Sequence, residues 1–155
     1  MKFLCDQMLK DLARWLRAAG YDAGVEPDGT PDQLLLERAT AQGRILLTRD
    51  RRFAQGLPGQ AGLHLLDCVD PDDCFQELRE KLGVDWLYRP FTRCLACNTP
   101  LIEGAESQWE QVPEYSRQRA SRLLYCPNCR QLFWDGSHVR RMRERLQQAA
   151  AGGAG

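Results

Sequence analysis

One short stretch decides the fold, an apolar run that ends in a charged pair: Arg44-Ile45-Leu46-Leu47-Thr48-Arg49-Asp50. Its uninterrupted apolar centre predicts a strand that is buried on both faces, as strands are in a parallel sheet covered by helices. Asp50 follows just beyond the carboxyl end of this strand, and ligand sites of such sheets gather at that edge. The stretch therefore predicts an α/β domain with a charged site at one edge of its sheet.

Strand and helix patterns alternate through the rest of the first 89 residues. The expected elements are a strand over 2–5, a helix from Met8 to Gly20, a weak strand over 21–25, a helix from Pro31 to Gly43, a strand over 63–68, and a helix over 71–82 capped by Asp70 and ended by Gly83. This order predicts a mostly parallel sheet with helices on its faces. Asp6, directly after the first strand, then falls at the same edge as Asp50.

Two carboxylates at one edge of a sheet repel each other and need a cation. Hard oxygen ligands of this kind favour Mg²⁺ or Mn²⁺. Asp32 lies in the first turn of the second expected helix. It could complete the metal site, or it could be an acid that the helix dipole stabilises by about 0.3–1 kcal/mol. Both interpretations stay open for Asp32.

The seven cysteines include two close pairs separated by 28 residues, Cys94-x-x-Cys97 and Cys126-x-x-Cys129. Four thiolates on two such turns predict a tetrahedral, structural Zn²⁺ site whose four positions are all filled by protein, although the spacing also fits iron. A small segment with few apolar residues is held together by such a metal. Cys5, Cys68 and Cys74 are expected to behave as small hydrophobic residues without a function of their own.

Several motifs together resemble one known family, the RNase domain found at the C-terminal end of the worm mutator exonuclease and as free-standing prokaryotic proteins. The motifs are Phe3-Leu4-x-Asp6-x-Met8-Leu9-x-x-Leu12-Ala13-Arg14-Trp15-Leu16-Arg17-x-x-Gly20-Tyr21-Asp22, Asp32 before Leu34-Leu35, Arg44 to Asp50, and Phe133-Trp134-Asp135-Gly136-Ser137-His138. The resemblance implies a PIN-like three-layer α/β fold with a mostly parallel sheet, followed by a small zinc ribbon. It also implies that the metal-binding catalytic acids are Asp6, Asp32 and Asp50.

The resemblance covers nearly the whole chain. We expect a PIN-like nuclease domain over 1–89, a zinc ribbon over 90–147 and a disordered tail over 148–155.

Arginines cluster around the expected acidic site and in the expected last helix. Surface solubility is their ordinary role, but guanidinium groups also bind phosphate in a bidentate manner. The RNA-binding candidates are Arg14, Arg17, Arg49, Arg140, Arg141 and His138. His138 could contact phosphate or transfer a proton, or it could be an ordinary surface histidine beside a helix start.

Charge and hydropathy along the chain restrict the classes of protein to which it could belong. The 21 Lys and Arg balance 21 Asp and Glu, but the nine basic residues after residue 90 are all arginines. No apolar run is long enough to span a membrane, and Asp6 comes before any signal-peptide apolar region, so a cytoplasmic protein is expected. The resemblance, together with the acids and arginines, implies a ribonuclease dependent on Mg²⁺ or Mn²⁺ that acts on RNA, mainly single-stranded, with the zinc ribbon assisting binding. The alternatives are a non-catalytic RNA-binding zinc protein and a protein-interaction adaptor.

Overall fold

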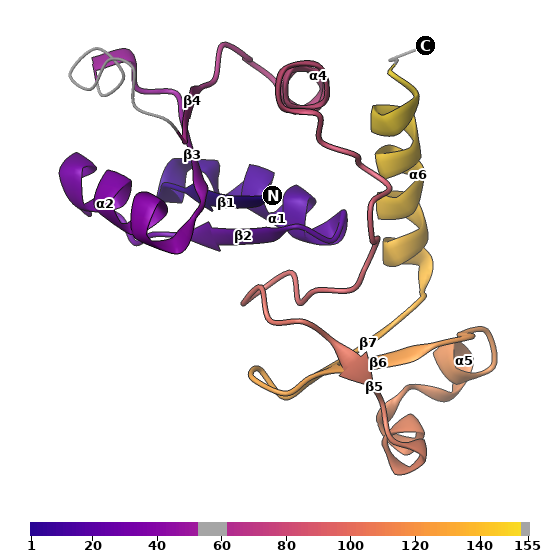
Figure 1. Cartoon of the computed structure of the whole chain (residues 1–155). Helices are drawn as coiled ribbons and strands as arrows, with labels where there is room; N and C mark the ends of the chain where they lie inside the picture. Colours follow the sequence, from indigo (N-terminus) through magenta and orange to yellow (C-terminus); the bar gives the residue numbers. More distant parts are fainter. Residues whose placement is uncertain (53–61, 153–155) are drawn as a thin grey trace.

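A computed structural model describes residues 1–52 and 62–152 of the chain (Figure 1). Its first part contains a four-stranded sheet in the order β2-β1-β3-β4. The strands are β1 (Lys2–Cys5), β2 (Asp22–Val25), β3 (Ile45–Thr48) and β4 (Leu63–Leu65). All three strand pairings are parallel, and Cys5 lies between Val25 on one side and Leu47 on the other. The predicted parallel α/β architecture is confirmed.

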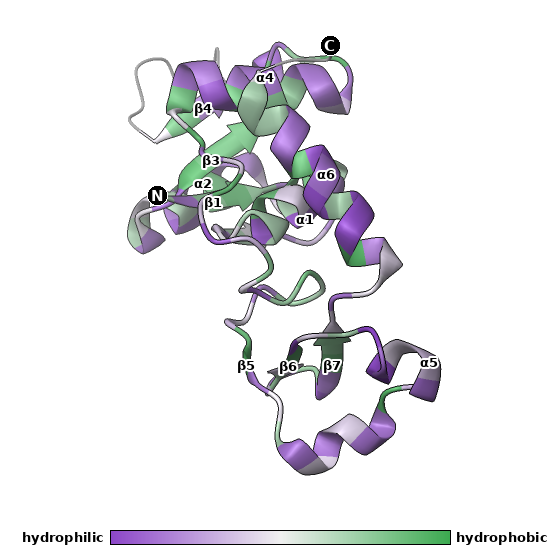
Figure 2. Ribbon diagram, turned by 90° about the vertical axis from the view of Figure 1, so that its right-hand side faces the viewer, coloured by the Kyte–Doolittle hydropathy of each residue, from purple (hydrophilic) through white to green (hydrophobic). Residues whose placement is uncertain are grey.

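Helices cover both faces of this sheet because successive strand residues point to opposite sides. Leu4 and Leu46 pack on one face against α2 (Asp32–Gln42). Phe3, Cys5 and Leu47 face the other side, where the larger core includes side chains from three more helices. These helices are α1 (Lys10–Ala18), which follows the short 3₁₀ helix η1 (Gln7–Leu9), α4 (Pro71–Leu82) and α6 (Ser137–Ala151). Figure 2 shows the inner strand β3 in green, the colour of hydrophobic residues.

The fourth strand is shorter than the expected span of 63–68. The Leu66 amide donates a hydrogen bond to the Thr48 carbonyl, but the next amide, that of Asp67, donates to the Glu77 carboxylate at 2.9 Å. Cys68 then forms a disulfide with Cys74 of α4. The expectation that these two cysteines are free is wrong, because the chain folds back on itself at this point. Cys5 is fully buried, which raises the pKa of its thiol to about 12, as expected for a cysteine that only packs.

The second part of the chain is built on a small antiparallel sheet in the order β5-β6-β7. Its elements are β5 (Ile102–Glu103), η2 (Glu106–Gln111), α5 (Glu114–Arg117), β6 (Leu123–Cys126) and β7 (Gln131–Trp134). The last helix, α6, runs from this sheet back alongside α4 (Figure 1) and buries Met142 and Leu146 in the larger core.

The expected disordered tail begins too early. α6 continues through Ala151, and Ala149 and Ala150 pack against the core, so residues 148–151 are ordered by apolar contacts that follow the same helical face as Met142 and Leu146. Residues 153–155 lie outside the described residues. Among the residues that are described, no helix is both long and apolar enough to cross a membrane.

The segment that joins the two parts is held by the end of α1. The amides of Arg89 and Phe91 donate to the carbonyls of Ala19 and Ala18, both at 2.8 Å. Gly20 is required there, because a Cβ at this position would lie 2.4 Å from the Arg89 carbonyl oxygen. The linker is therefore fixed to the first part by its backbone.

Candidate active site and metal centre

Asp6 lies at the carboxyl end of β1, and one of its carboxylate oxygens is in an unusual position. Within the described part of the chain, Asp6 Oδ1 is buried and has no hydrogen-bond partner. Burial raises the pKa of Asp6, and the neighbouring charges of Asp28 and Asp32 raise it further against the lowering effect of the Met8 and Leu9 amides. A buried carboxylate oxygen with no partner is costly unless a cation or a proton compensates it.

The neighbouring acids come from the loop between β2 and α2. Asp32 is exposed in the first turn of α2, and Asp28 is exposed in the preceding turn. Asp28 is not among the acids predicted for the site. Its position in the loop that leaves the carboxyl end of β2, an edge where ligand sites gather, is the sequence signal that could have indicated it.

Asp50 lies two residues beyond the end of β3, the strand next to β1. Its Oδ1 accepts a hydrogen bond from the Arg52 amide at 2.9 Å, and its own amide donates to Thr48 Oγ1 at 3.0 Å. The bond from the Arg52 amide is that of a helix N-cap, since residues 51 and 52 are helical. Asp50 thus has a structural role at the sheet edge in addition to the predicted catalytic one.

The predicted acids share one edge of the sheet without converging on a point. Among the described residues, the ligand atoms of Asp6, Asp32 and Asp50 do not form a close group of the kind that the cysteines form.

The four predicted cysteine ligands do converge. The Sγ atoms of Cys94, Cys97, Cys126 and Cys129 all lie within 4.8 Å of one another. Cys94 and Cys129 are 3.9 Å apart, and Cys97 and Cys126 are 3.5 Å apart. Thiolates placed ~2.3 Å from a tetrahedral zinc stand about 3.8 Å from one another, so the group could hold a metal ion such as zinc.

The two turns that carry these cysteines have the same backbone design. The residue after each second cysteine has a positive φ, 73° at Asn98 and 58° at Arg130. The amide of that residue bonds back to the carbonyl of the first cysteine, at 2.9 Å for Asn98 and 2.8 Å for Arg130. Each turn thereby presents its two sulfur atoms to the same point.

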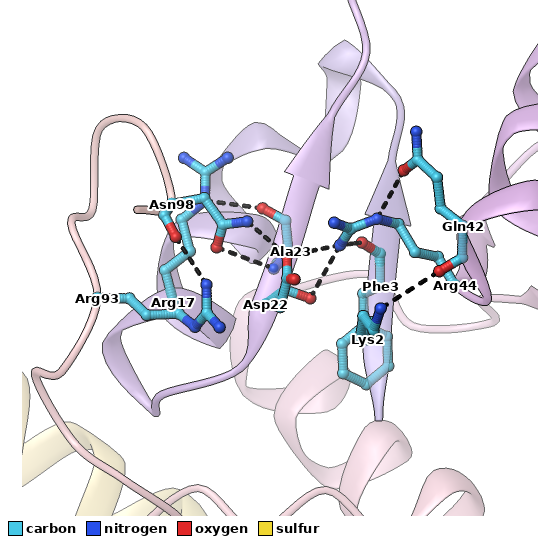
Figure 3. A network of polar contacts seen from close by, with 9 residues as sticks. All are labelled: Lys2, Phe3, Arg17, Asp22, Ala23, Gln42, Arg44, Arg93 and Asn98. Carbon is cyan, nitrogen blue, oxygen red and sulfur yellow. Dashed lines mark hydrogen bonds and ion pairs between the residues drawn. The ribbon is translucent and has the colours of Figure 1, made fainter. Parts of the chain in front are cut away.

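The first cysteine turn docks on the exposed edge of β2 (Figure 3). Asn98 Oδ1 accepts from the Ala23 amide at 3.1 Å, and Asn98 Nδ2 donates to Asp22 Oδ1 at 2.6 Å. Arg44 donates to the same Asp22 oxygen at 2.6 Å. Burial raises the pKa of Asp22, but the bonds from Arg44 and Asn98 outweigh this and hold the pKa of the carboxyl below its ordinary value. The metal centre and the parallel sheet are therefore one connected structure.

Arg17 is a mostly buried member of this junction. It is 8% exposed. Its Nε donates to the Ala23 carbonyl at 2.8 Å, and its Nη1 donates to the carbonyls of Leu95 and Ala96 at 3.0 and 3.2 Å. Its guanidinium thus holds the cysteine turn against the sheet. Arg17 also lines the open groove described below, and its phosphate contact stays a prediction.

Replacing Arg17 should accordingly lower stability. We expect Arg17→Met to reduce the free energy of unfolding by about 2 kcal/mol or more, because it leaves carbonyls at the junction without their charged donor. Denaturant unfolding measures this. Arg14→Met is the matched control on the same helix, since Arg14 is exposed, and it should change stability by no more than about 0.5 kcal/mol. Equal effects of the two substitutions would contradict the role of Arg17.

Two other predicted RNA contacts are brought together from distant parts of the chain. Arg14 Nη2 of α1 lies 3.3 Å from His138 Nε2 at the start of α6. Arg14 also lines an open groove of about 570 Å³. The groove extends from Gln7, the residue that follows Asp6, to the cysteine turn at Leu95 and Cys97. Its lining therefore joins the neighbourhood of Asp6 to the four-cysteine cluster.

The remaining arginines are placed separately. Arg49 is exposed beside Asp50 and donates to Cys74 Sγ at 3.3 Å. Arg140 and Arg141 are exposed on α6. Arg145 of the same helix pairs with Asp72 at 3.2 Å. A helix turns by about 100° per residue, so Arg140 and Arg141 lie on the side of α6 opposite the buried Met142 and Leu146.

The fold and the site define an α/β protein in which an acidic sheet edge is joined to a cluster of four cysteines that could hold a metal ion. The Mut7-C RNAse domain model matches residues 1–146, and the chain belongs to this family, which supports a nuclease role. A human protein described as an exonuclease mut-7 homolog is 33% identical over 102 residues, 63% of this chain and 12% of the human protein. No solved structure gives a significant match.

Proposed function

We propose that the protein is a metal-dependent ribonuclease that hydrolyses phosphodiester bonds of single-stranded RNA at the edge formed by Asp6, Asp32 and Asp50. The observation that carries the proposal is the buried, unpartnered Oδ1 of Asp6, whose carboxyl already feels the charges of Asp28 and Asp32. A polar atom in this position is suited to a cation. The family match and the groove beside this edge supply the reason for RNA as the substrate.

The residues of the site have different roles in metal binding and in RNA binding. Asp6 would hold the cation with its buried oxygen, and Asp32 at the start of α2 and Asp50 beyond the end of β3 would supply further carboxylate ligands. Mg²⁺ or Mn²⁺ bound there supplies positive charge that activates water and offsets the charge developing on the phosphate. Lys10 and Arg14 hold the RNA backbone in the groove, and His138 lies beside Arg14 to contact the next phosphate. The cysteine centre holds zinc and keeps its turn in place.

The test uses protein that keeps its zinc. After dialysis without Mg²⁺ or Mn²⁺, the chain should leave labelled single-stranded RNA intact, and adding either ion should start cleavage. Dialysis is preferred to a strong chelator, because a chelator would also remove structural zinc and unfold the ribbon. RNA bound without turnover in the presence of both ions would favour the non-catalytic RNA-binding protein. Absence of RNA binding would favour the protein-interaction adaptor.

Binding should depend on the groove. Arg14→Met should weaken RNA binding and lower the slope of log K against log salt by roughly 0.7, the value for one lost phosphate contact on a single strand. Lys2→Met is the matched control, since Lys2 is exposed at the amino end of β1, the opposite edge of the sheet. An unchanged slope in Arg14→Met would place the RNA elsewhere.

A further inference from the structure

A second cavity adjoins the groove and has no role in the function proposed above. It has a volume of about 80 Å³ and lies where the linker, the small sheet and α6 meet. Phe91, Leu95, Phe133, Trp134 and Val139 form its apolar walls. A cavity needs roughly 10–15 Å³ for each water, so this one has room for several atoms, on the order of one aromatic ring.

The aromatic walls are not closed over by the fold. Phe91, Phe133 and Trp134 are all half-buried, in contrast to Trp86, which is fully buried in the core. Aromatic rings that only filled the ribbon would be covered in the same way as Trp86. These rings instead leave part of their surface accessible from the cavity.

Phe91 is held in place at a cost. Its φ of 58° is rare for a bulky residue. The bond from its amide to Ala18 fixes this backbone to α1, and the Arg143 guanidinium lies 5.0 Å from the centre of its ring. Strained residues that the surrounding structure holds firmly cluster at ligand sites. The ring is therefore a pre-positioned wall of the cavity.

The rim of the cavity is basic. Arg93, Arg122 and Arg143 line it, with Asp135 as the acid. The Asp135 carboxylate already accepts bonds from Ser121 and from the Arg122 amide. Arg93 donates to the Asn98 carbonyl at 2.8 Å, and Arg122 lies 3.8 Å from the Glu103 carboxylate. Aromatic walls with positively charged guanidinium groups at the entrance suit a flat base attached to a phosphate backbone.

Leu95 lines both this cavity and the groove that carries Arg14. We propose that the cavity binds one base of the RNA strand whose backbone lies in the groove. The proposal rests on RNA being the substrate. The base leaves the strand beside Leu95 and stacks against the aromatic walls, so the cysteine centre positions a specific contact as well as stabilising the fold.

The experiment compares single-stranded RNA 8-mers, either intact or lacking one base at each position in turn. Binding to the zinc-loaded full chain is measured without Mg²⁺ or Mn²⁺, so that no cleavage is needed. One abasic position should weaken binding by roughly 5- to 150-fold, the effect of losing one stacked base, while its phosphates remain. In Val139→Phe, which fills the cavity from α6, intact RNA should bind as weakly as that abasic RNA, and the positional difference should disappear.

Val69→Phe is the matched control, since Val69 is 84% exposed and does not line the cavity. It should keep the wild-type pattern. Zinc content and thermal unfolding will show whether Val139→Phe folds. If it does not, Phe133→Leu serves as the second cavity variant, because it removes a stacking ring but keeps an apolar side chain, and it should also weaken RNA binding. If the folded cavity variants still bind intact RNA more tightly than the abasic RNA, the base does not occupy the cavity and the proposal is overturned. The same result is expected if the cavity binds a peptide instead of a base. Unaltered cleavage in that case would leave the proposed function standing. Absence of any RNA binding by the wild type would overturn both proposals.

Discussion

Asp6→Asn should abolish cleavage of single-stranded RNA, lowering its rate by about 100-fold or more. The substitution removes the carboxylate charge that would hold the cation. Without the cation, the negative charge that develops on the phosphate in the transition state is no longer stabilised. RNA binding should remain or improve, because one negative charge next to the phosphate path is removed. The measurement is the single-turnover rate with saturating Mn²⁺ alongside the dissociation constant.

The same substitution should raise stability when Mg²⁺ and Mn²⁺ are absent. Burial and the neighbouring acids raise the pKa of Asp6 in the folded state, so ionising this carboxyl opposes folding. The penalty is absent below the unfolded pKa and grows as the pH rises through the folded pKa. Asn carries no such penalty, so the variant should be the more stable protein at neutral pH, and the difference should shrink in acid.

Asp73→Asn is the matched control, because it removes an exposed carboxylate at the start of α4. It should leave the cleavage rate unchanged. Wild-type cleavage by a folded Asp6→Asn protein would exclude the proposed metal site. A loss of cleavage accompanied by lower stability would show that Asp6 is only a structural residue.

The sequence predicts those features that depend on neighbouring residues. The apolar run from Ile45 to Thr48 forms a strand as expected, and Gly43 and Gly83 end α2 and α4 with φ values of 65° and 71°. The two cysteine pairs meet because each turn needs only a few local bonds to aim its sulfur atoms. Strands, helix ends and cysteine turns of this kind can be predicted because they depend on residues that are close together in the sequence.

The features that the sequence does not predict join distant segments. Arg17 reaches Leu95 across 78 positions, and Asn98 reaches Asp22 across 76. Both contacts depend on how the cysteine turn docks on β2, and neither helical nor strand periodicity encodes this. An arginine on an amphipathic helix has the same sequence pattern whether it faces solvent or another segment. The burial of Arg17 therefore required the structure.

The docking of the cysteine turn leads to the second large effect. Cys126→Ser should remove zinc, from about one ion per chain to none, and unfold residues 94–134. The loss is large because structural zinc contributes ~10–16 kcal/mol of binding free energy in small zinc peptides, and the ribbon has little other core. Elemental analysis and hydrogen exchange measure the two effects.

The damage should extend into the parallel sheet at one defined place. The Ala23 amide donates to Asn98 Oδ1, so its hydrogen exchange should accelerate in Cys126→Ser together with the ribbon amides. The Leu47 amide of the central strand β3 should stay protected, because its partners lie within the sheet. Cys5→Ala is the matched control: Cys5 is also fully buried but lies outside the metal centre, so zinc should be retained. A zinc-free Cys126→Ser protein that still protects Ala23 would show that Asn98 docks on β2 without the metal. Because α6 starts at the ribbon and ends in the larger core, acceleration at Met142 as well would show that the metal supports the whole C-terminal half and not only the edge of β2.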